Sequence, residues 1–168
     1  MASIYASAMS APAVGLAAKV LTVSDGVATG TREDRSGPAL VERLACAGFD
    51  VVAHEVTADG ADAVVGALGR LTDDFAGLVV TTGGTGFGPR DLTPEGTRTV
   101  LEREAPGLAE AMRLANPLGR LSRAVAGTRG EALVLNTPGS SSGAVETLDA
   151  VLDVIPHALA LLRGDREH

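Results

Sequence analysis

Residues 77–94 read GLVVTTGGTGFGPRDLTP and join a short apolar run to a loop of closely spaced glycines. The run at residues 77–82 is apolar enough to predict a strand buried on both faces, as in a parallel sheet. Residues 83–88 then hold four glycines, and Thr93 followed by Pro94 predicts the start of a helix. A strand, a glycine loop and a helix in this order predict an α/β unit with a ligand-binding loop after the strand.

The chain on either side of this stretch alternates between strand-like and helix-like segments. Short β-rich or apolar runs predict strands at residues 19–23, 49–56, 77–82, 124–128 and 132–135. Apolar spacing and capping residues predict helices that begin near Ser36, Asp59, Thr93, Pro106 and Ser140. Arg129-Gly130 separates the last two strands and predicts a hairpin turn. The alternation predicts an α/β fold with a mostly parallel sheet, helices on both faces and an antiparallel edge hairpin.

Residues 1–17 differ in composition from the rest of the chain. They are small and weakly apolar, no basic residue precedes the apolar run, and several serines and Pro12 interrupt it. This pattern fits neither a secretory signal peptide nor a transmembrane helix. We therefore expect a flexible N-terminal tail at residues 1–17 and a single domain at residues 18–168.

Composition limits the classes of partner. Hydrophobic residues make up 45% of the 168 residues, enough for a full core, but aromatic residues make up only 2%, so that core must be aliphatic. The net charge of −7 disfavours binding to nucleic acid or to a membrane surface. Cys46 is the only cysteine, which excludes an intrachain disulfide and fits the reducing cytoplasm, where we expect the protein.

Three polar loops follow predicted strands, at Ser24, at Thr81 and at Asn136. In a parallel sheet these loops share one edge, and ligands bind beyond the carboxyl ends of the strands. Glycine amides of the second loop can point together at an anion. Its candidate ligand-binding residues are Thr82, Gly83, Gly84, Thr85 and Gly86. A tight turn without a ligand is the alternative. A P-loop and a Rossmann fingerprint are excluded, because the loop lacks Gly-Lys-Ser/Thr and the G-x-G-x-x-G spacing.

Two carboxylates stand near the same edge, Asp59 after the second predicted strand and Asp91 at the end of the glycine-rich loop. Both are candidate catalytic residues and Mg²⁺ ligands, because Mg²⁺ binds one or two carboxylates together with phosphate oxygens and water. The alternatives are that Asp59 caps a helix and that Asp91 is an ordinary turn residue. Capping and metal binding are compatible at Asp59.

The remaining candidates lie in the first and third loops. Further ligand-binding residues are expected at Ser24, Asp25, Asn136, Pro138, Gly139 and Ser140. Asn136 and the amides after it suit a planar heterocycle or a second phosphate, and the helix that begins near Ser140 favours anions at its positive end. Simple capping is the alternative for that serine. Arg32, Arg35 and Arg90 either clamp phosphate or remain solvated surface charges.

Three motifs resemble the Mog/MoaB family, whose members include bacterial molybdopterin adenylyltransferase and the G domain of gephyrin. They are TVSDG at residues 22–26, TTGGTGFGPRDLTP at residues 81–94 and NTPGS at residues 136–140. The resemblance implies an α/β/α sandwich of the molybdopterin-binding fold, assembled as a homotrimer. It implies molybdopterin and ATP as substrates, with Mg²⁺ as cofactor. By local matching, the family's two important carboxylates fall on Asp59 and Asp91.

The function expected from this resemblance is Mg-ATP-dependent adenylylation of the molybdopterin phosphate during molybdenum cofactor biosynthesis, with pyrophosphate released. A molybdenum-insertion enzyme would receive the product. One departure stands at Ser141 and Ser142, where many members have Pro-Lys. Two alternatives remain open: a non-catalytic molybdopterin-binding or carrier protein of the same fold, and an interaction domain with a decayed pocket.

Overall fold

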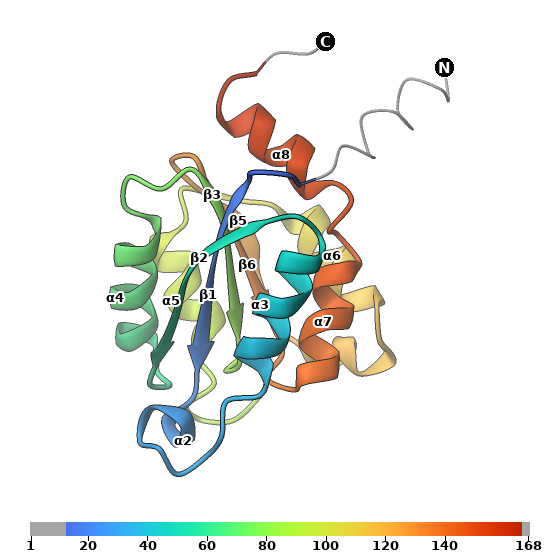
Figure 1. Cartoon of the computed structure of the whole chain (residues 1–168). Helices are drawn as coiled ribbons and strands as arrows, with labels where there is room; N and C mark the ends of the chain where they lie inside the picture. The colour runs from blue at the N-terminus through green and yellow to red at the C-terminus, as the bar shows by residue number, and fades with distance from the viewer. Residues whose placement is uncertain (1–12, 166–168) are drawn as a thin grey trace.

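A six-stranded sheet forms the centre of the protein, whose computed structural model describes residues 13–165 (Figure 1). The strands are β1 (Ala17–Val23), β2 (Asp50–Thr57), β3 (Gly77–Thr82), β4 (Arg103–Glu104), β5 (Ala126–Arg129) and β6 (Ala132–Thr137). Their order is β2-β1-β3-β6-β5-β4. Strands β2, β1, β3 and β6 are parallel, whereas β5 is antiparallel to both of its neighbours. The mostly parallel sheet with an antiparallel edge hairpin is therefore confirmed.

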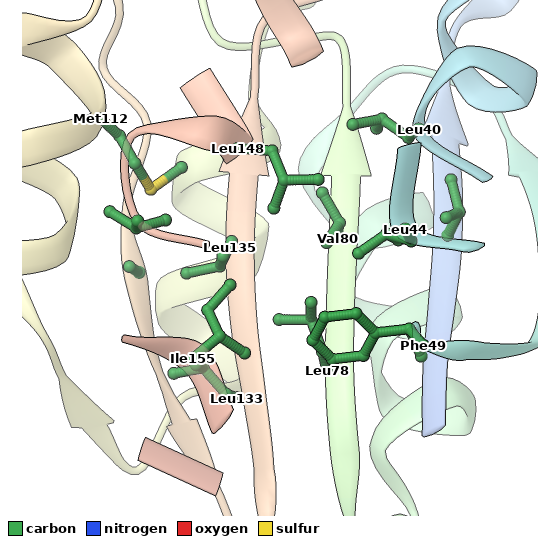
Figure 2. Packing of buried hydrophobic residues seen from close by; sticks show 14 of the residues in the cluster. Leu40, Leu44, Phe49, Leu78, Val80, Met112, Leu133, Leu135, Leu148 and Ile155 are labelled. Carbon is green, nitrogen blue, oxygen red and sulfur yellow. The ribbon is translucent and has the colours of Figure 1, made fainter. Parts of the chain in front are cut away.

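Helices cover both faces of this sheet. They are α2 (Asp25–Ala28), α3 (Ser36–Cys46), α4 (Ala61–Thr72), α5 (Thr93–Val100), α6 (Pro106–Leu114), the 3₁₀ helix η1 (Pro117–Leu121), α7 (Ser141–Asp149) and α8 (Ile155–Leu162). One face packs against α3, α6, α7 and α8, and Figure 2 shows side chains such as Leu44 and Leu148 beside Val80 of β3. A smaller apolar cluster joins the other face to α4 and α5. The three-layer α/β/α sandwich is confirmed.

The apolar spacing of the sequence explains these layers. In α4, Val64, Ala67, Leu68 and Leu71 recur at intervals of three and four residues and are all buried. This spacing gives the helix one apolar face, and that face packs on the sheet. Strand β3 is buried at every position because helices cover both of its sides.

Several element boundaries differ from the sequence-based expectation. Gly60, not Asp59, occupies the N-cap position of α4, so the prediction that Asp59 begins this helix as its cap is wrong. Arg35, not Ser36, occupies the N-cap position of α3, and its side chain makes no capping hydrogen bond. The chain also restarts as the separate helix α8 around Pro156. The four-residue α2, the two-residue β4 and η1 were not predicted. They are too short to leave a periodic pattern.

The packed part of the chain begins before residue 18. Ala13 is buried in the larger core and Leu16 packs against it, and β1 begins at Ala17. Ala13, Leu16 and Ala17 of the expected tail are therefore part of the fold, whereas Val14 and Gly15 are exposed and residues 1–12 lie outside the described part of the chain. No helix within residues 13–165 combines the length and the apolar character needed to span a membrane.

The strand order places a crevice at the carboxyl ends of β1 and β3. From β1 the chain passes through α3 to β2 on one side, and then through α4 to β3 on the other side of β1. Loops that leave adjacent strands in opposite directions open a space between them, which is where ligands bind in such sheets. In Figure 1 these carboxyl ends point toward α2.

Candidate active site

A pocket of about 770 Å³ lies at this crevice. It is lined by residues that follow β1, β2, β3 and β6, together with part of the α2–α3 connection and η1. The predicted site residues that line it are Ser24, Asp59, Thr82, Gly83, Gly84, Thr85, Gly86, Asp91, Pro138, Gly139 and Ser140. A second cavity of about 280 Å³ shares part of this wall, including Leu118 and Ser140. The structure thus gathers all but two of the predicted residues in one place.

The loop after β3, residues 83–91, is called the glycine loop below. Its first two residues adopt positive φ, +99° at Gly83 and +66° at Gly84. A Cβ at Gly83 would overlap the carbonyl oxygen of Val23, and a Cβ at Gly84 would overlap Thr93 Oγ1. Thr93 Oγ1 donates a hydrogen bond to Gly83 O at 2.9 Å, and Thr93 N donates to Gly84 O at 3.1 Å. Glycine is therefore required at both positions for the loop to pass between β1 and α5.

Three consecutive amides of this loop are available to a ligand. Gly83 N donates to Thr137 O at 3.1 Å, but the N–H groups of Gly84, Thr85 and Gly86 have no acceptor among the described residues. All three residues line the pocket. The Thr85 hydroxyl has no hydrogen-bond partner there either, whereas Thr82 Oγ1 donates to Pro138 O at 2.8 Å. Neighbouring free amides of this kind bind anions.

The start of α7 brings further amides to the same pocket. Ser140 is its N-cap residue, and Ser140 Oγ accepts a hydrogen bond from Gly143 N at 3.2 Å. The capping interpretation of Ser140 is thus confirmed. The N–H groups of Ser141 and Ser142 keep no acceptor within residues 13–165, and Ser140 and Ser141 line the pocket. The positive end of a nine-residue helix therefore adjoins the ligand space.

Asp59 lies close to Gly84, and Asp91 lies close to Gly86, so both carboxylates are near the free amides. Asp59 Oδ1 is 3.4 Å from the position that a Cβ at Gly84 would take, and Asp91 Oδ2 is 3.0 Å from the corresponding position at Gly86. One oxygen of each carboxylate is engaged locally. Asp59 Oδ2 accepts from Asp25 N at 2.8 Å, and Asp91 Oδ2 accepts from Gly88 N at 2.8 Å. The second oxygen of each carboxylate makes no hydrogen bond to the described residues.

Carboxylate oxygens such as those of Asp59 and Asp91 are ligands that Mg²⁺ takes together with phosphate. Residues 13–165 contain no cluster of three or more His, Cys, Asp or Glu side chains able to enclose a metal. Mg²⁺ needs no such enclosure, because one or two carboxylates, phosphate oxygens and water complete its octahedral shell. Asp59 and Asp91 are the two carboxylates of the pocket that lie near the free amides.

Asp25 does not line the pocket. Its carboxylate binds Arg90, with Nε–Oδ2 at 2.5 Å and Nη2–Oδ1 at 3.0 Å, and Arg90 Nη2 also donates to Asp59 O at 2.8 Å. The hydrogen bond from Arg90 lowers the pKa of Asp25 below its ordinary value, against the opposing effect of burial. Asp25 Oδ1 also accepts from Asp59 N at 3.1 Å. Asp25 and Arg90 therefore hold Asp59 in place, and the carboxylate of Asp25 is engaged by these contacts and not by the pocket.

Asn136 is also absent from the pocket wall, because its side chain is fully buried. Its Nδ2 donates to Thr81 Oγ1 and Thr97 Oγ1, both at 3.0 Å, and its Oδ1 accepts from Val125 N at 3.2 Å. Both amide hydrogens are used, so no donor remains for a ligand. The side chain of Asn136 therefore does not make the expected contact from the pocket wall in this structure. The residue instead ties β6 to β3, to α5 and to the segment before β5.

Arg123 is a site residue that sequence reasoning missed. Its Nε donates to Gly86 O at 2.8 Å, its Nη2 donates to Asp91 O, and its guanidinium forms an ion pair with Glu95 of α5. Burial raises the pKa of Glu95, but the hydrogen bonds from Arg123 and from the backbone lower it by more. The pKa of Glu95 therefore lies below its usual value. Arg123 thus fastens the glycine loop to α5 without lining the pocket. No local sequence motif predicts this contact.

Comparison with known proteins places this geometry in a family. Residues 19–157 match the family model described as "Probable molybdopterin binding domain". A molybdopterin adenylyltransferase of Helicobacter pylori is 38% identical over 153 residues, covering 87% of each chain. The Escherichia coli molybdopterin adenylyltransferase is 34% identical over 165 residues, covering 86% of this chain and 84% of its own.

A solved structure agrees with the sequence matches. The molybdopterin biosynthesis enzyme MoaB of Thermus thermophilus superposes with a TM-score of 0.84 and 47% sequence identity, covering 89% of this chain and 97% of its own. Matches of this extent include the strands, the glycine loop and both carboxylate positions. The chain therefore belongs to the Mog/MoaB family of molybdenum cofactor biosynthesis, as the three loop motifs predicted.

Proposed function

We propose that the protein transfers AMP from Mg-ATP to the terminal phosphate of molybdopterin and releases pyrophosphate. The observation that supports this most is that Asp59 and Asp91 line the same pocket as the free amides of Gly84, Thr85 and Gly86, with Asp59 close to Gly84 and Asp91 close to Gly86. A receptor for the pterin alone has no need of two carboxylates beside an anion-binding loop, because carboxylates repel phosphate unless a cation lies between them.

The proposed reaction is an in-line displacement at phosphorus. An oxygen of the molybdopterin phosphate attacks the α-phosphorus of ATP, a new P–O bond forms, and the bond to the β-phosphate oxygen breaks. The electron pair of that bond leaves with pyrophosphate, and the product is an adenylated pterin joined through a diphosphate. Such a transfer needs little covalent help from the protein, so positioning and charge neutralisation supply most of the rate.

The residues of this chain have distinct parts in that transfer. The amides of Gly84, Thr85 and Gly86 donate to one phosphate, and the start of α7 at Ser140 and Ser141 receives a second. Asp59 and Asp91 would hold Mg²⁺, which supplies neutralisation of phosphate charge when bound. Arg123 and the Asp25–Arg90 pair hold the loop and Asp59 in place. The two neighbouring cavities, which share lining residues, offer separate space for the pterin and the nucleotide.

The direct test is incubation of the purified protein with molybdopterin and Mg-ATP labelled at the α-phosphate. We expect label to appear in a pterin product and pyrophosphate to form in equal amount, and omission of Mg²⁺ should abolish both. Replacement of Asp62, an exposed residue of α4 outside the pocket wall, by Asn is the matched control and should leave transfer unchanged. Molybdopterin binding without any labelled product would refute the proposal.

A second candidate function is a non-catalytic molybdopterin-binding or carrier protein. Ser141 and Ser142 favour it, because many family members carry Pro-Lys there and this pocket wall has no lysine. It predicts tight pterin binding with no dependence on ATP or Mg²⁺, so the same incubation separates the two functions. We also propose a homotrimer, which light scattering tests, and delivery of the product to a molybdenum-insertion enzyme.

A further inference from the structure

Arg32 lies in the segment that connects α2 to α3, residues 29–35, called the connecting arm below. The arm forms part of the pocket wall and brings Arg32 and Arg35 to it, the two cationic side chains among the lining residues. Four carboxylates line the same pocket, at Glu33, Asp34, Asp59 and Asp91. A pocket built for phosphate-bearing substrates therefore draws its side-chain positive charge from the arm.

The two arginines of the arm differ in what they already bind. Arg35 Nε lies 3.0 Å from Glu33 Oε2, in an exposed ion pair. Arg32 has no ion pair and no side-chain hydrogen bond with any described residue. Among the arginines of residues 13–165, Arg103 is the only other one of which this is true, and Arg103 lies on β4 outside the pocket wall. An unpaired guanidinium at the wall of a ligand pocket is poised to bind an anion.

The backbone beneath Arg32 is shaped to hold its side chain. Thr31 N and Arg32 N both donate to Gly26 O at 2.9 Å, which folds the arm back over the start of α2. A Cβ at Gly26 would lie 3.0 Å from Arg32 Cβ and 3.6 Å from Arg32 Cδ. The absence of a side chain at Gly26 therefore leaves room for the aliphatic part of Arg32.

The far end of the arm is fastened by Asp34. Thr22 Oγ1 donates to Asp34 Oδ2 at 2.7 Å, and His54 Nε2 lies 3.2 Å from the same oxygen. Asp34 Oδ1 accepts from Gly37 N at 2.9 Å. These contacts join the arm to β1, β2 and α3. They also engage Asp34, so that this carboxylate is not free to pair with Arg32.

We propose that Arg32 is a substrate-binding residue that grips a phosphate group in the pocket, with Gly26 and Asp34 as the residues that position it. This inference deepens the proposed function and rests on it for the identity of the substrates. Guanidinium and phosphate match in charge and in paired donor geometry. The phosphate belongs either to the triphosphate of ATP or to molybdopterin, and separate binding measurements distinguish the two.

The test measures dissociation constants for Mg-ATP, for sodium pyrophosphate and for molybdopterin by titration calorimetry. We expect Arg32→Ala to weaken binding of Mg-ATP or of molybdopterin by roughly tenfold, the size of a lost charge-assisted hydrogen bond. If the affinity for pyrophosphate falls as well, Arg32 binds the triphosphate of ATP. If the affinity for pyrophosphate is unchanged, Arg32 binds the phosphate of molybdopterin. Arg103→Ala removes an equally unpaired charge away from the pocket and should change none of the three constants.

Gly26→Ala provides a second variant that leaves the charge of the protein unchanged. It should weaken the same ligand as Arg32→Ala, by a smaller factor, because the added methyl group displaces the arginine stem. Affinities within twofold of wild type in Arg32→Ala would overturn the inference, and so would a wild-type protein that binds none of the three ligands. Binding requires no turnover, so a protein that binds through Arg32 but transfers no AMP would refute only the proposed function.

Discussion

Arg123 fastens the glycine loop to α5, and its replacement by Ala should harm both stability and turnover. The side chain donates to two loop carbonyls, Gly86 O and Asp91 O, and pairs with Glu95. It is 31% exposed and Glu95 is 39% exposed, so solvent screens the ion pair. Two charge-assisted hydrogen bonds at about 1 kcal/mol each, plus about 0.5 kcal/mol for the screened pair, give a loss of about 2–3 kcal/mol in free energy of unfolding.

Urea denaturation followed by circular dichroism measures this loss, and a matched variant separates its parts. Glu95→Gln keeps both loop contacts and should cost only about 0.5–1 kcal/mol. Arg123→Lys keeps a positive charge but cannot reach both carbonyls and Glu95 together, so it should remain impaired. AMP transfer should fall in Arg123→Ala under conditions where the variant is fully folded. A loss in Glu95→Gln equal to that in Arg123→Ala would show that the loop contacts contribute nothing, and would refute the reasoning.

Three further predictions follow from the geometry of the loops. Gly84→Ala should lower the free energy of unfolding by about 2–4 kcal/mol in a denaturant titration, because its φ of +66° disfavours a side chain and the new methyl group would overlap Thr93 Oγ1; a neutral effect would contradict the packing described. Asn136→Ala should cost about 2–4 kcal/mol by leaving buried partners unsatisfied, yet its molybdopterin affinity should equal that of wild type, and a selective loss of affinity would restore Asn136 as a ligand contact. Because Arg90 holds the pKa of Asp25 below its ordinary value in the folded protein, ionised Asp25 stabilises the fold above the pKa of the unfolded chain, and this stabilisation disappears as the pH falls through the folded-state pKa. Unfolding of wild type and Asp25→Asn measured from pH 7 to pH 3 should therefore show a difference in stability that is largest at neutral pH and shrinks below about pH 4, and a difference that grows on acidification would contradict the assignment.

The parts of the fold that the sequence predicted are those encoded locally. GLVVTT at residues 77–82 contains no charged residue and is buried at every position, Thr81 and Thr82 included, and its predicted bounds coincide with those of strand β3. The four glycines at residues 83–88 predicted a tight turn, and the structure has positive φ at Gly83 and Gly84 in this turn. Asp59 and Asp91 both reached the pocket because each directly follows a parallel strand or its loop, and such ends share one edge of the sheet.

The parts that were missed depend on contacts between distant residues. Arg123 meets Gly86 and Glu95 across 37 and 28 residues of sequence, and Arg90 meets Asp25 across 65. Neither periodicity nor capping carries information about such pairs. Asn136 shows the converse case, since this residue of the NTPGS motif, expected to contact ligand, directs its side chain into the core. Arg90, considered only as a phosphate clamp or a surface charge, is a structural anchor.

The proposed AMP transfer depends most on Asp59 and Asp91 acting together beside the free amides of the glycine loop. The measurement that tests it most directly is molybdopterin affinity and AMP transfer in the same preparations of Asp59→Asn and Asp91→Asn, at saturating Mg-ATP. We predict that each variant binds molybdopterin as wild type does and transfers no detectable AMP. Transfer at the wild-type rate in either variant would contradict the account.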